Sequence, residues 1–123
     1  MTDNQISKII LDCAFKVHTE LGPGLLEKVY QNCLAYEILE AGLNVEVEKP
    51  LPLVYKDIHF ECGYRIDLLI ENKIVVEIKV VETFNDVHVA QTLTYMRLTN
   101  CKLGLLLNFY TKSLKDGIKR LIL

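Results

Sequence analysis

The sequence predicts a single α/β domain in which helices flank a central mixed β-sheet. The chain has 123 residues, which is the usual size of one domain. Half of the residues are apolar and 24% are charged, so the chain can bury a core, and disordered and fibrous proteins are excluded. The apolar period also changes along the chain from 3.6 residues to 2 and back, as it does where helices and strands alternate.

The N-terminal third is expected to form two helices. Apolar residues recur at three- and four-residue steps over residues 4–21, which is the pattern of a helix with one buried face. Gly22-Pro23-Gly24 ends this helix, and a second helix follows from about Leu25 to Ala41. The residues of the second helix that we expect to be buried share a helical spacing: Leu26, Val29, Cys33, Leu34 and Ile38.

Strands are expected in the middle of the chain, where the period becomes 2. Apolar and polar residues alternate over 43–48, and Pro50 and Pro52 restrict this strand to a sheet edge or a bend. Residues 74–81 are almost continuously apolar, which favours a central strand that is covered on both faces. Two further strands are expected over 53–56 and 58–70, with a turn near Lys56-Asp57 and a bulge at Gly63.

The C-terminal part is expected to hold a helix over 87–98, a strand over 103–109 and a short final helix from Ser113. It also carries the positive charge of the chain: the net charge is +5 over 97–123, against −4 over 1–50 and −3 over 51–96. These basic residues form either a local basic surface or an ordinary solvated helix face. One side of the 87–98 helix is predominantly apolar: Val87, Ala90, Thr94 and Leu98.

Several classes of protein are disfavoured. The N-terminus is polar and no apolar run is long enough to span a membrane, so we expect a soluble cytoplasmic protein with no membrane partner. The four cysteines contain no Cys-x-x-Cys pair, which argues against a zinc or iron–sulfur site. They are Cys13, Cys33, Cys62 and Cys101.

Two charged residues interrupt the most apolar strand. Glu77 and Lys79 are two residues apart, so they point to the same face of the strand. One explanation is an ion pair that stabilises a half-exposed sheet. Another explanation involves Asp67 on the preceding strand, because a second carboxylate close to Glu77 would need a neutralising partner.

The length of the turn between the two strands decides whether these carboxylates meet. If residues 71–73 form a three-residue turn, Asp67 lies directly opposite Glu77 on one face. Hard oxygen ligands of this kind suit Mg²⁺ or Mn²⁺. A two-residue turn would instead place Asp67 opposite Val76 or Ile78.

Asp67, followed ten residues later by Glu77-x-Lys79, resembles the active-site core of the PD-(D/E)XK nuclease superfamily, and the order of elements is similar too. The resemblance implies a restriction-endonuclease-like core and metal-dependent hydrolysis of phosphodiester bonds. It implies that Asp67, Glu77 and the backbone carbonyl of Ile78 bind Mg²⁺ or Mn²⁺. Lys79 would orient the attacking water or offset negative charge on the phosphate.

The segment from Gly24 to Tyr30 resembles the Gly-x-x-Glu-x-x-Tyr signature of a small branch of this superfamily, the GxxExxY proteins. This resemblance implies that Glu27 joins the metal site as a further catalytic residue. Alternatively, Gly24 is the N-cap and Glu27 forms half of a capping box, and both roles can hold at once. Tyr30 is expected to contribute to packing rather than to chemistry.

Gln91 and Tyr95 resemble the Gln-x-x-x-Tyr motif of RecB-like nucleases. Residues four apart lie on one helix face. Gln91 is expected to hydrogen-bond a phosphate or a metal-bound water, and Tyr95 to stack on a base or bind a phosphate. His88 is a further candidate on the same side, although a lone histidine more often has a structural role.

Three functions are consistent with these residues. The first is a metal-dependent nuclease acting on nucleic acid, with DNA favoured as the substrate, although no residue separates DNA from RNA. The second is a non-catalytic module that binds nucleic acid or protein, and the third is a structural homodimer in which Glu77 and Lys79 only stabilise the sheet. In the nuclease interpretation residues 112–120 contact phosphates, and a chain this small acts as a homodimer or with a partner protein.

Overall fold

The computed structural model describes residues 1–61 and 63–123, so Cys62 lies outside the described residues. It confirms a small α/β domain with three helices and a mixed five-stranded sheet. No helix within the described residues is long and apolar enough to cross a membrane. The elements follow in the order α1 (Asp3–Leu21), α2 (Glu27–Glu40), β1 (Val45–Pro50), β2 (Leu53–Tyr55), β3 (Ile58–Phe60), β4 (Arg65–Ile70), β5 (Ile74–Lys79), α3 (Asp86–Leu98), β6 (Leu103–Asn108), η1 (Leu114–Gly117) and β7 (Ile118–Ile122).

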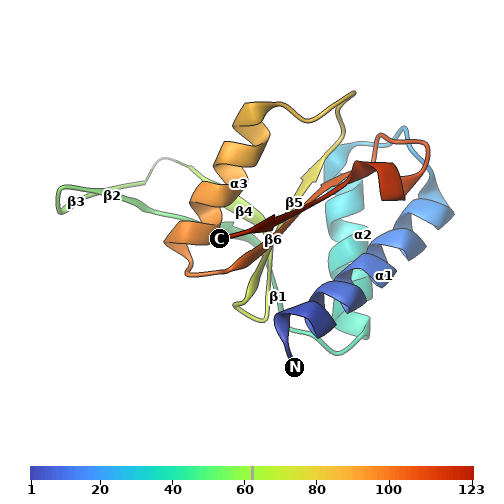
Figure 1. Cartoon of the computed structure of the whole chain (residues 1–123), viewed down its shortest axis with the longest axis horizontal. Helices are drawn as coiled ribbons and strands as arrows, with labels where there is room; N and C mark the ends of the chain where they lie inside the picture. The colour runs from blue at the N-terminus through green and yellow to red at the C-terminus, as the bar shows by residue number, and fades with distance from the viewer. Residues whose placement is uncertain (62) are drawn as a thin grey trace.

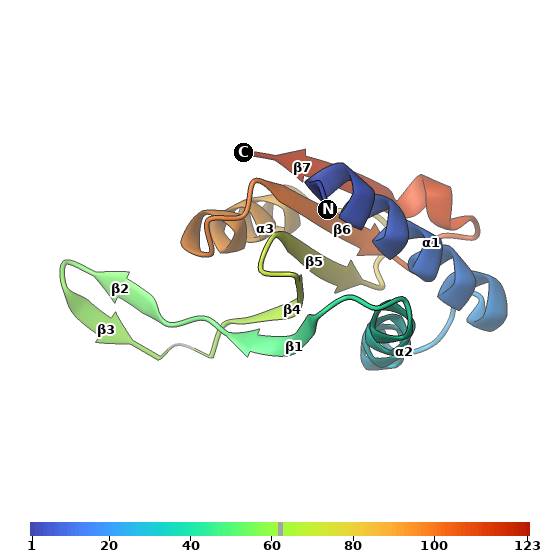
Figure 2. The ribbon, with the colours of Figure 1, turned by 90° about the horizontal axis from the view of Figure 1, so that it is seen from below.

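The main sheet has the strand order β1-β4-β5-β6-β7. Strands β5 and β6 are parallel, and the other neighbours are antiparallel. The predictions of an edge strand before Pro50 and of a central strand beginning at Ile74 are therefore confirmed. Strands β2 and β3 form a separate two-stranded ribbon that projects away from the rest of the domain (Figure 2).

Helices cover both faces of the sheet, as Figure 1 shows with α1 and α2 on one side of the strands and α3 on the other. Ile10 and Leu34 belong to the core that α1 and α2 form with the sheet. Tyr95 and Met96 of α3 pack on the opposite face. Strand β5 is buried on both faces, which is the physical reason for its continuous apolar sequence.

The β4–β5 hairpin has the three-residue turn that one of the two alternatives required. Ile70 pairs with Ile74, and the Lys73 N–H donates to the Ile70 carbonyl at 2.9 Å. Glu71 and Asn72 both have φ 53°, as in a type I′ turn, whose twist matches that of the flanking strands. This register determines which residues of β4 and β5 lie opposite one another.

Tyr30 connects the start of α2 to the core. Its ring is fully buried and stacks on Phe109 with the ring centroids 4.6 Å apart. Its hydroxyl donates to the Gly22 carbonyl and accepts from the Leu25 N–H at 3.1 Å. These contacts agree with the expected packing role of Tyr30, and they fix the loop that leads into Glu27.

The start of α2 differs from the expected one. The helix begins at Glu27, and its N-cap residue is Leu26, which makes no side-chain capping bond. The capping box proposed for Gly24 and Glu27 is therefore wrong. Leu26 and Val29 are exposed rather than buried, because the docking of Tyr30 turns a different side of the helix towards the sheet.

The expectations of a strand over 58–70 and of a final helix from Ser113 are also wrong. The expected strand over 58–70 is divided into β3 and β4, and Gly63 between them has φ 75°, which ends the extended run. The expected final helix is one 3₁₀ turn, η1, followed by strand β7. Strand β7 pairs with β6, whose edge would otherwise expose unpaired backbone groups.

Candidate active site

Two carboxylates lie just beyond the last backbone pair of the β4–β5 ladder, Leu68 with Val76. The Asp67 N–H donates to Oε2 of Glu77 at 2.8 Å, and the Ile78 N–H donates to Oδ2 of Asp67 at 2.8 Å. These reciprocal bonds replace the next rung of the ladder, so each carboxylate is held by the backbone of the neighbouring strand. Asp67 therefore lies across from Glu77, as a three-residue turn requires.

The second oxygen of each carboxylate remains free. Oδ1 of Asp67 and Oε1 of Glu77 make no hydrogen bond to any residue that the structure describes. Glu77 is only 3% exposed and Asp67 is half-buried, and buried charges are costly unless they are paired. This donor set fits Mg²⁺, which commonly takes one or two carboxylates and fills its other positions with water and phosphate oxygens.

The two carboxyl groups resist being ionised together. Burial, followed by the charge of Asp67, raises the pKa of Glu77 to about 8. Burial is also the main cause that raises the pKa of Asp67 to about 6; Glu27 and Glu48 add to this rise, while the Ile78 N–H and Lys79 oppose it. Without a cation, the pair therefore retains a proton near neutral pH, and a bound cation would displace it.

Lys79 is the last residue of β5 and shares a face with Glu77. Its positive charge lowers the pKa of both carboxyl groups, although burial outweighs this effect. Within the described residues, the ion pairs shorter than 4 Å are Lys8–Asp12, Lys28–Glu48 and Lys49–Glu46. The interpretation of Glu77 and Lys79 as an ion pair is therefore wrong, because the two side chains do not form one.

Asn108 fixes the backbone directly after Lys79. It is buried and is the register partner of Lys79 on β6. Its amide donates to the Val81 carbonyl at 2.7 Å, and its Oδ1 accepts from the Val81 and Tyr110 N–H groups at 3.2 and 3.1 Å. Sequence reasoning missed Asn108, because its main partner is 27 residues away and no local motif marks it.

Glu27 does not converge with Asp67 and Glu77. It is exposed at the first position of α2, and no three Asp, Glu, His or Cys side chains among residues 1–61 and 63–123 are grouped so that they could hold a metal ion. Its negative charge nevertheless raises the pKa of both Asp67 and Glu77. The structure therefore brings Glu27 into the electrostatic environment of the pair, and its role as a ligand stays a prediction.

Glu48 is an acidic neighbour that the sequence did not reveal. The pairs Val47–Leu68 and Lys49–Ile66 flank it, so it lies across from Asp67 on β1. Its φ of 51° interrupts the ladder at this point. Its carboxylate pairs with Lys28 at 2.9 Å, and this contact lowers the pKa of Glu48. In the sequence it looks like any other polar residue of an alternating strand.

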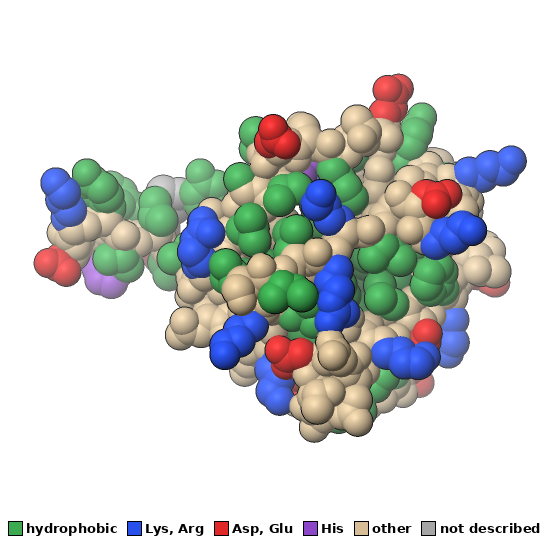
Figure 3. Space-filling model, in the orientation of Figure 1, with side chains coloured by type: hydrophobic (Ala, Val, Ile, Leu, Met, Phe, Trp, Pro, Cys, Tyr) green, Lys and Arg blue, Asp and Glu red, His purple; other side chains and the backbone are tan. Residues whose placement is uncertain are grey.

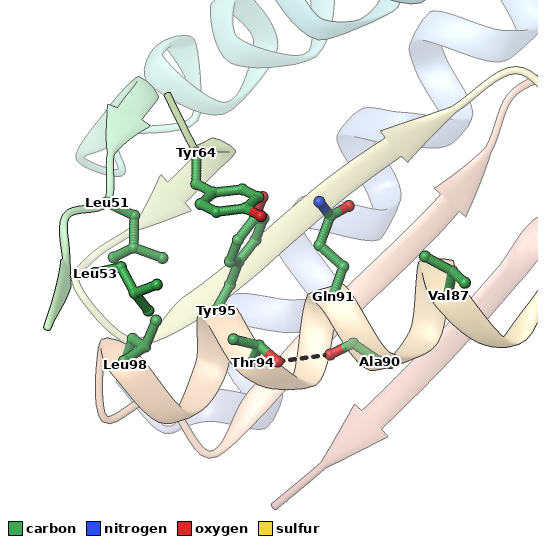
Figure 4. A pocket seen from close by; sticks show the side chains of 9 residues that line it. All are labelled: Leu51, Leu53, Tyr64, Val87, Ala90, Gln91, Thr94, Tyr95 and Leu98. Atoms are coloured by element: carbon green, nitrogen blue, oxygen red, sulfur yellow. Dashed lines mark hydrogen bonds between the residues drawn. The ribbon is translucent and has the colours of Figure 1, made fainter. Parts of the chain in front are cut away.

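Gln91 and Tyr95 reach the same region from α3. Tyr95 is buried, and burial followed by the charges of Glu77 and Asp67 raises its pKa to about 12. Gln91 lies one helical turn earlier, and both side chains project from α3 towards the strands in Figure 4. Tyr95 is thus a neighbour of the carboxylate pair, and Gln91 projects from the same side of α3 one turn away.

His88 has a structural role at the start of α3. The ring Nδ1 of His88 accepts from the backbone N–H of Asn85 at 3.2 Å, and the backbone N–H of His88 donates to Oδ1 of Asn85 at 3.0 Å. This is a capping box, and it leaves the ring hydrogen on Nε2. Burial, followed by the charge of Lys79, lowers the pKa of His88.

The C-terminal basic residues do not form one continuous surface. On the face that Figure 3 shows, Lys and Arg side chains are scattered among acidic and hydrophobic ones. Arg120 faces α1, where it donates to Oγ of Ser7 at 3.1 Å and to Asn4. Lys119 faces the opposite side of the sheet from Arg120. Leu106 of β6 pairs with Glu77 of β5 and with Lys119 of β7, so Lys119 shares a sheet face with the carboxylates. Two strand spacings, about 10 Å, separate the backbone of Lys119 from that of Glu77.

The family comparison agrees with this geometry. A family model described as the PD-(D/E)XK nuclease superfamily matches residues 4–121. The chain belongs to this superfamily. Members of the PD-(D/E)XK superfamily are usually nucleases and generally use divalent metals. The resemblance to the superfamily is confirmed, and the roles of Asp67, Glu77 and Lys79 stay predictions. A search of curated proteins and a search of solved structures found no match.

In the metal-free protein, the carboxylate pair is expected to make stability fall as the pH rises from about 5 to 8. Raised pKa values mean that the folded state binds more protons than the unfolded state in this range, so deprotonation favours unfolding. Glu77→Gln removes the carboxyl group whose pKa is raised more. It should flatten this dependence and stabilise the protein at pH 8 by about 1–3 kcal/mol.

Thermal unfolding in the presence of a chelator, repeated across this pH range, measures the effect. Glu40→Gln, which removes an exposed carboxylate at the end of α2, is the matched control. Equal pH dependence in the two variants would contradict the assignment of the proton to the Asp67–Glu77 pair.

Proposed function

We propose that this protein is a metal-dependent nuclease that hydrolyses phosphodiester bonds of nucleic acid, with DNA as the favoured substrate. One observation carries the proposal: Asp67 and Glu77 are each fixed by one oxygen to the opposite strand, and each keeps its other oxygen free. Membership of the PD-(D/E)XK superfamily supports it. The motif from Gly24 to Tyr30 supports placing the chain in the GxxExxY branch.

The proposed metal site uses Asp67 and Glu77 as ligands for Mg²⁺ or Mn²⁺. The backbone carbonyl of Ile78 and the carboxylate of Glu27 are the further ligands that the family resemblance implies. When bound, the cation polarises the scissile phosphate and lowers the pKa of a water molecule. The two protein carboxylates leave coordination positions for this water and for the substrate.

The remaining residues are assigned to positioning and charge. Lys79 orients the attacking water or offsets negative charge that develops on the phosphate, and it has no ion pair within the described residues that would occupy its ammonium group. Gln91 hydrogen-bonds a phosphate oxygen or a metal-bound water. Tyr95, whose pKa is about 12, is neutral at physiological pH and acts as a hydrogen-bond donor rather than as a base.

A non-catalytic binding module is the weaker alternative. The fold alone does not determine function, so a binding module on this fold is physically reasonable. Such a module has no need for two adjacent carboxyl groups whose burial raises their pKa values, since burying them costs stability. The nuclease proposal explains why these groups are kept beside Lys79.

Glu77→Gln should abolish cleavage, with a loss of at least about a hundredfold. The substitution preserves the size of the side chain and an oxygen that can accept from the Asp67 N–H, so loss of activity would reflect loss of charge. A panel of single-stranded and double-stranded DNA and RNA with Mg²⁺ or Mn²⁺ provides the assay. Titration calorimetry with Mn²⁺ should show binding to the wild type and none to Asp67→Asn/Glu77→Gln.

Glu40→Gln is again the control and should both cleave and bind Mn²⁺ as the wild type does. Cleavage that survives Glu77→Gln would refute the assigned role of this carboxylate. Equal weak Mn²⁺ binding in the wild type and the double variant, with no cleavage, would favour the binding module.

Lys119 is expected to contact a phosphate of the bound nucleic acid, because it shares a sheet face with the carboxylates. Lys119→Gln should weaken oligonucleotide binding and reduce the slope of log affinity against log salt by about 1. Lys8→Gln is the matched control, since Lys8 is an exposed residue of α1 on the opposite side of the sheet. Fluorescence anisotropy at several salt concentrations measures both variants, and equal slopes would contradict the assignment.

A further inference from the structure

A groove of about 370 Å³ lies beside α3 and is lined mainly by apolar side chains. Val87, Ala90 and Leu98 line it from the helix. Leu51 and Leu53 line it from the segment that leads out of β1 into the β2–β3 ribbon. Figure 4 shows Leu51, Leu53 and Leu98 close together at one end of α3, with Val87 nearer its other end. The side of α3 that lines the groove is the apolar stripe that the sequence places on one side of the helix.

The stripe on α3 is not used for packing the core. The helix buries Thr92, Tyr95 and Met96 instead, while Val87 is 71% exposed and Leu98 is 48% exposed. A cluster of exposed apolar side chains is a common feature of binding sites. The lining of the groove is therefore complementary to a ligand with an apolar surface.

The groove approaches the candidate active site at Tyr95. Tyr95 lines the groove and lies close enough to Glu77 and Asp67 for their charges to act on its hydroxyl. The ring of Tyr64 stands 6.5 Å from that of Tyr95 in an edge-to-face arrangement and remains 46% exposed. Gln91 also lines the groove, and its amide makes no hydrogen bond to any of the described residues.

We propose that this groove binds an unpaired base of the substrate, so that the nuclease acts on single-stranded nucleic acid or on a base that has left the duplex. The proposal rests on the nuclease function. A base has an apolar face, which matches Tyr64 and the leucine walls, and a polar edge. The side-chain carbonyl oxygen of Gln91 can accept a hydrogen bond from this edge, while its NH₂ group donates to the phosphate oxygen assigned to it above. Sequence-tolerant binding of single strands relies on the same combination of aromatic rings and open bases.

Paired bases cannot use this groove. In a duplex the faces are stacked and the polar edges are paired, so a base must leave the stack before it reaches a lined pocket. Because Tyr95 lines the groove and is influenced by the charges of Asp67 and Glu77, a base bound there would lie near the phosphate that is cleaved. The base contact therefore selects unpaired substrate at the point of cleavage.

The test measures binding separately from cleavage. Fluorescently labelled single-stranded DNA, single-stranded RNA and a DNA duplex of the same sequence are titrated by anisotropy into the full chain carrying Glu77→Gln. We expect single strands to bind at least tenfold more tightly than the duplex. Adding Tyr64→Ala should weaken single-strand binding between about 5-fold and 150-fold, the effect of losing one base–aromatic stack.

Three controls separate stacking from other effects. Tyr36→Ala removes a tyrosine that is 61% exposed on α2, on the other face of the sheet, and should leave binding unchanged. Tyr64→Phe keeps the ring and should retain most of the affinity. An abasic single strand should bind equally to the proteins with and without Tyr64→Ala, because it has no base to stack. The melting temperature of each variant shows whether it is folded.

The outcomes that overturn the proposal are distinct from failure of the nuclease function. Tighter binding of the duplex, or equal effects of Tyr64→Ala and Tyr36→Ala, would refute the base-binding groove. A dimer that Tyr64→Ala dissociates without changing single-strand binding would assign the groove to self-association and refute it too. If nothing is cleaved by the wild type but single strands still depend on Tyr64, base binding stands and the nuclease proposal fails.

Discussion

The two hydrogen bonds that cross between β4 and β5 at Asp67, Glu77 and Ile78 are the constraint on which the site depends. They exist because the type I′ turn at Glu71 and Asn72 sets the register of the hairpin. A shift of the register by one residue would turn each of the two side chains to a new partner or to the opposite face. The chemistry of the molecule therefore depends on a short turn at the far end of the hairpin.

The surrounding fold both causes the energetic cost of burying the two carboxyl groups and offsets part of it. The helices on the two faces of the sheet bury β5, and this burial raises the pKa of Glu77. Lys79 and the Ile78 N–H act in the opposite direction on Asp67. A divalent cation would complete this compensation, because it neutralises both carboxylates and uses the two oxygens that the backbone leaves free. Asp67 and Glu77 thus affect both the stability of the fold and the proposed function.

The sequence predicted those parts of the site that depend on local patterns. Spacing and alternation put Lys79 on the same face as Glu77, and they placed Asp67 opposite Glu77 on the condition of a three-residue turn. The structure has that turn, so the register follows from it. Glu48 and Asn108 could not be found in this way, since their contacts depend on which distant strands become neighbours. The prediction for the start of α2 was wrong for a similar reason, because the buried Tyr30 determines which side of the helix faces the core. The apolar stripe of α3 was visible in the sequence, but only the packing of Tyr95 and Met96 reveals that it faces a groove.

The most direct test of the cation site is diffraction from crystals soaked in Mn²⁺, with anomalous data collected near the manganese edge. We expect an anomalous peak between Oδ1 of Asp67 and Oε1 of Glu77, within coordination distance of both, with the two backbone hydrogen bonds retained. A peak elsewhere on the chain, or ordered carboxylates with no peak at saturating Mn²⁺, would contradict the claim that this hairpin is built to hold a cation.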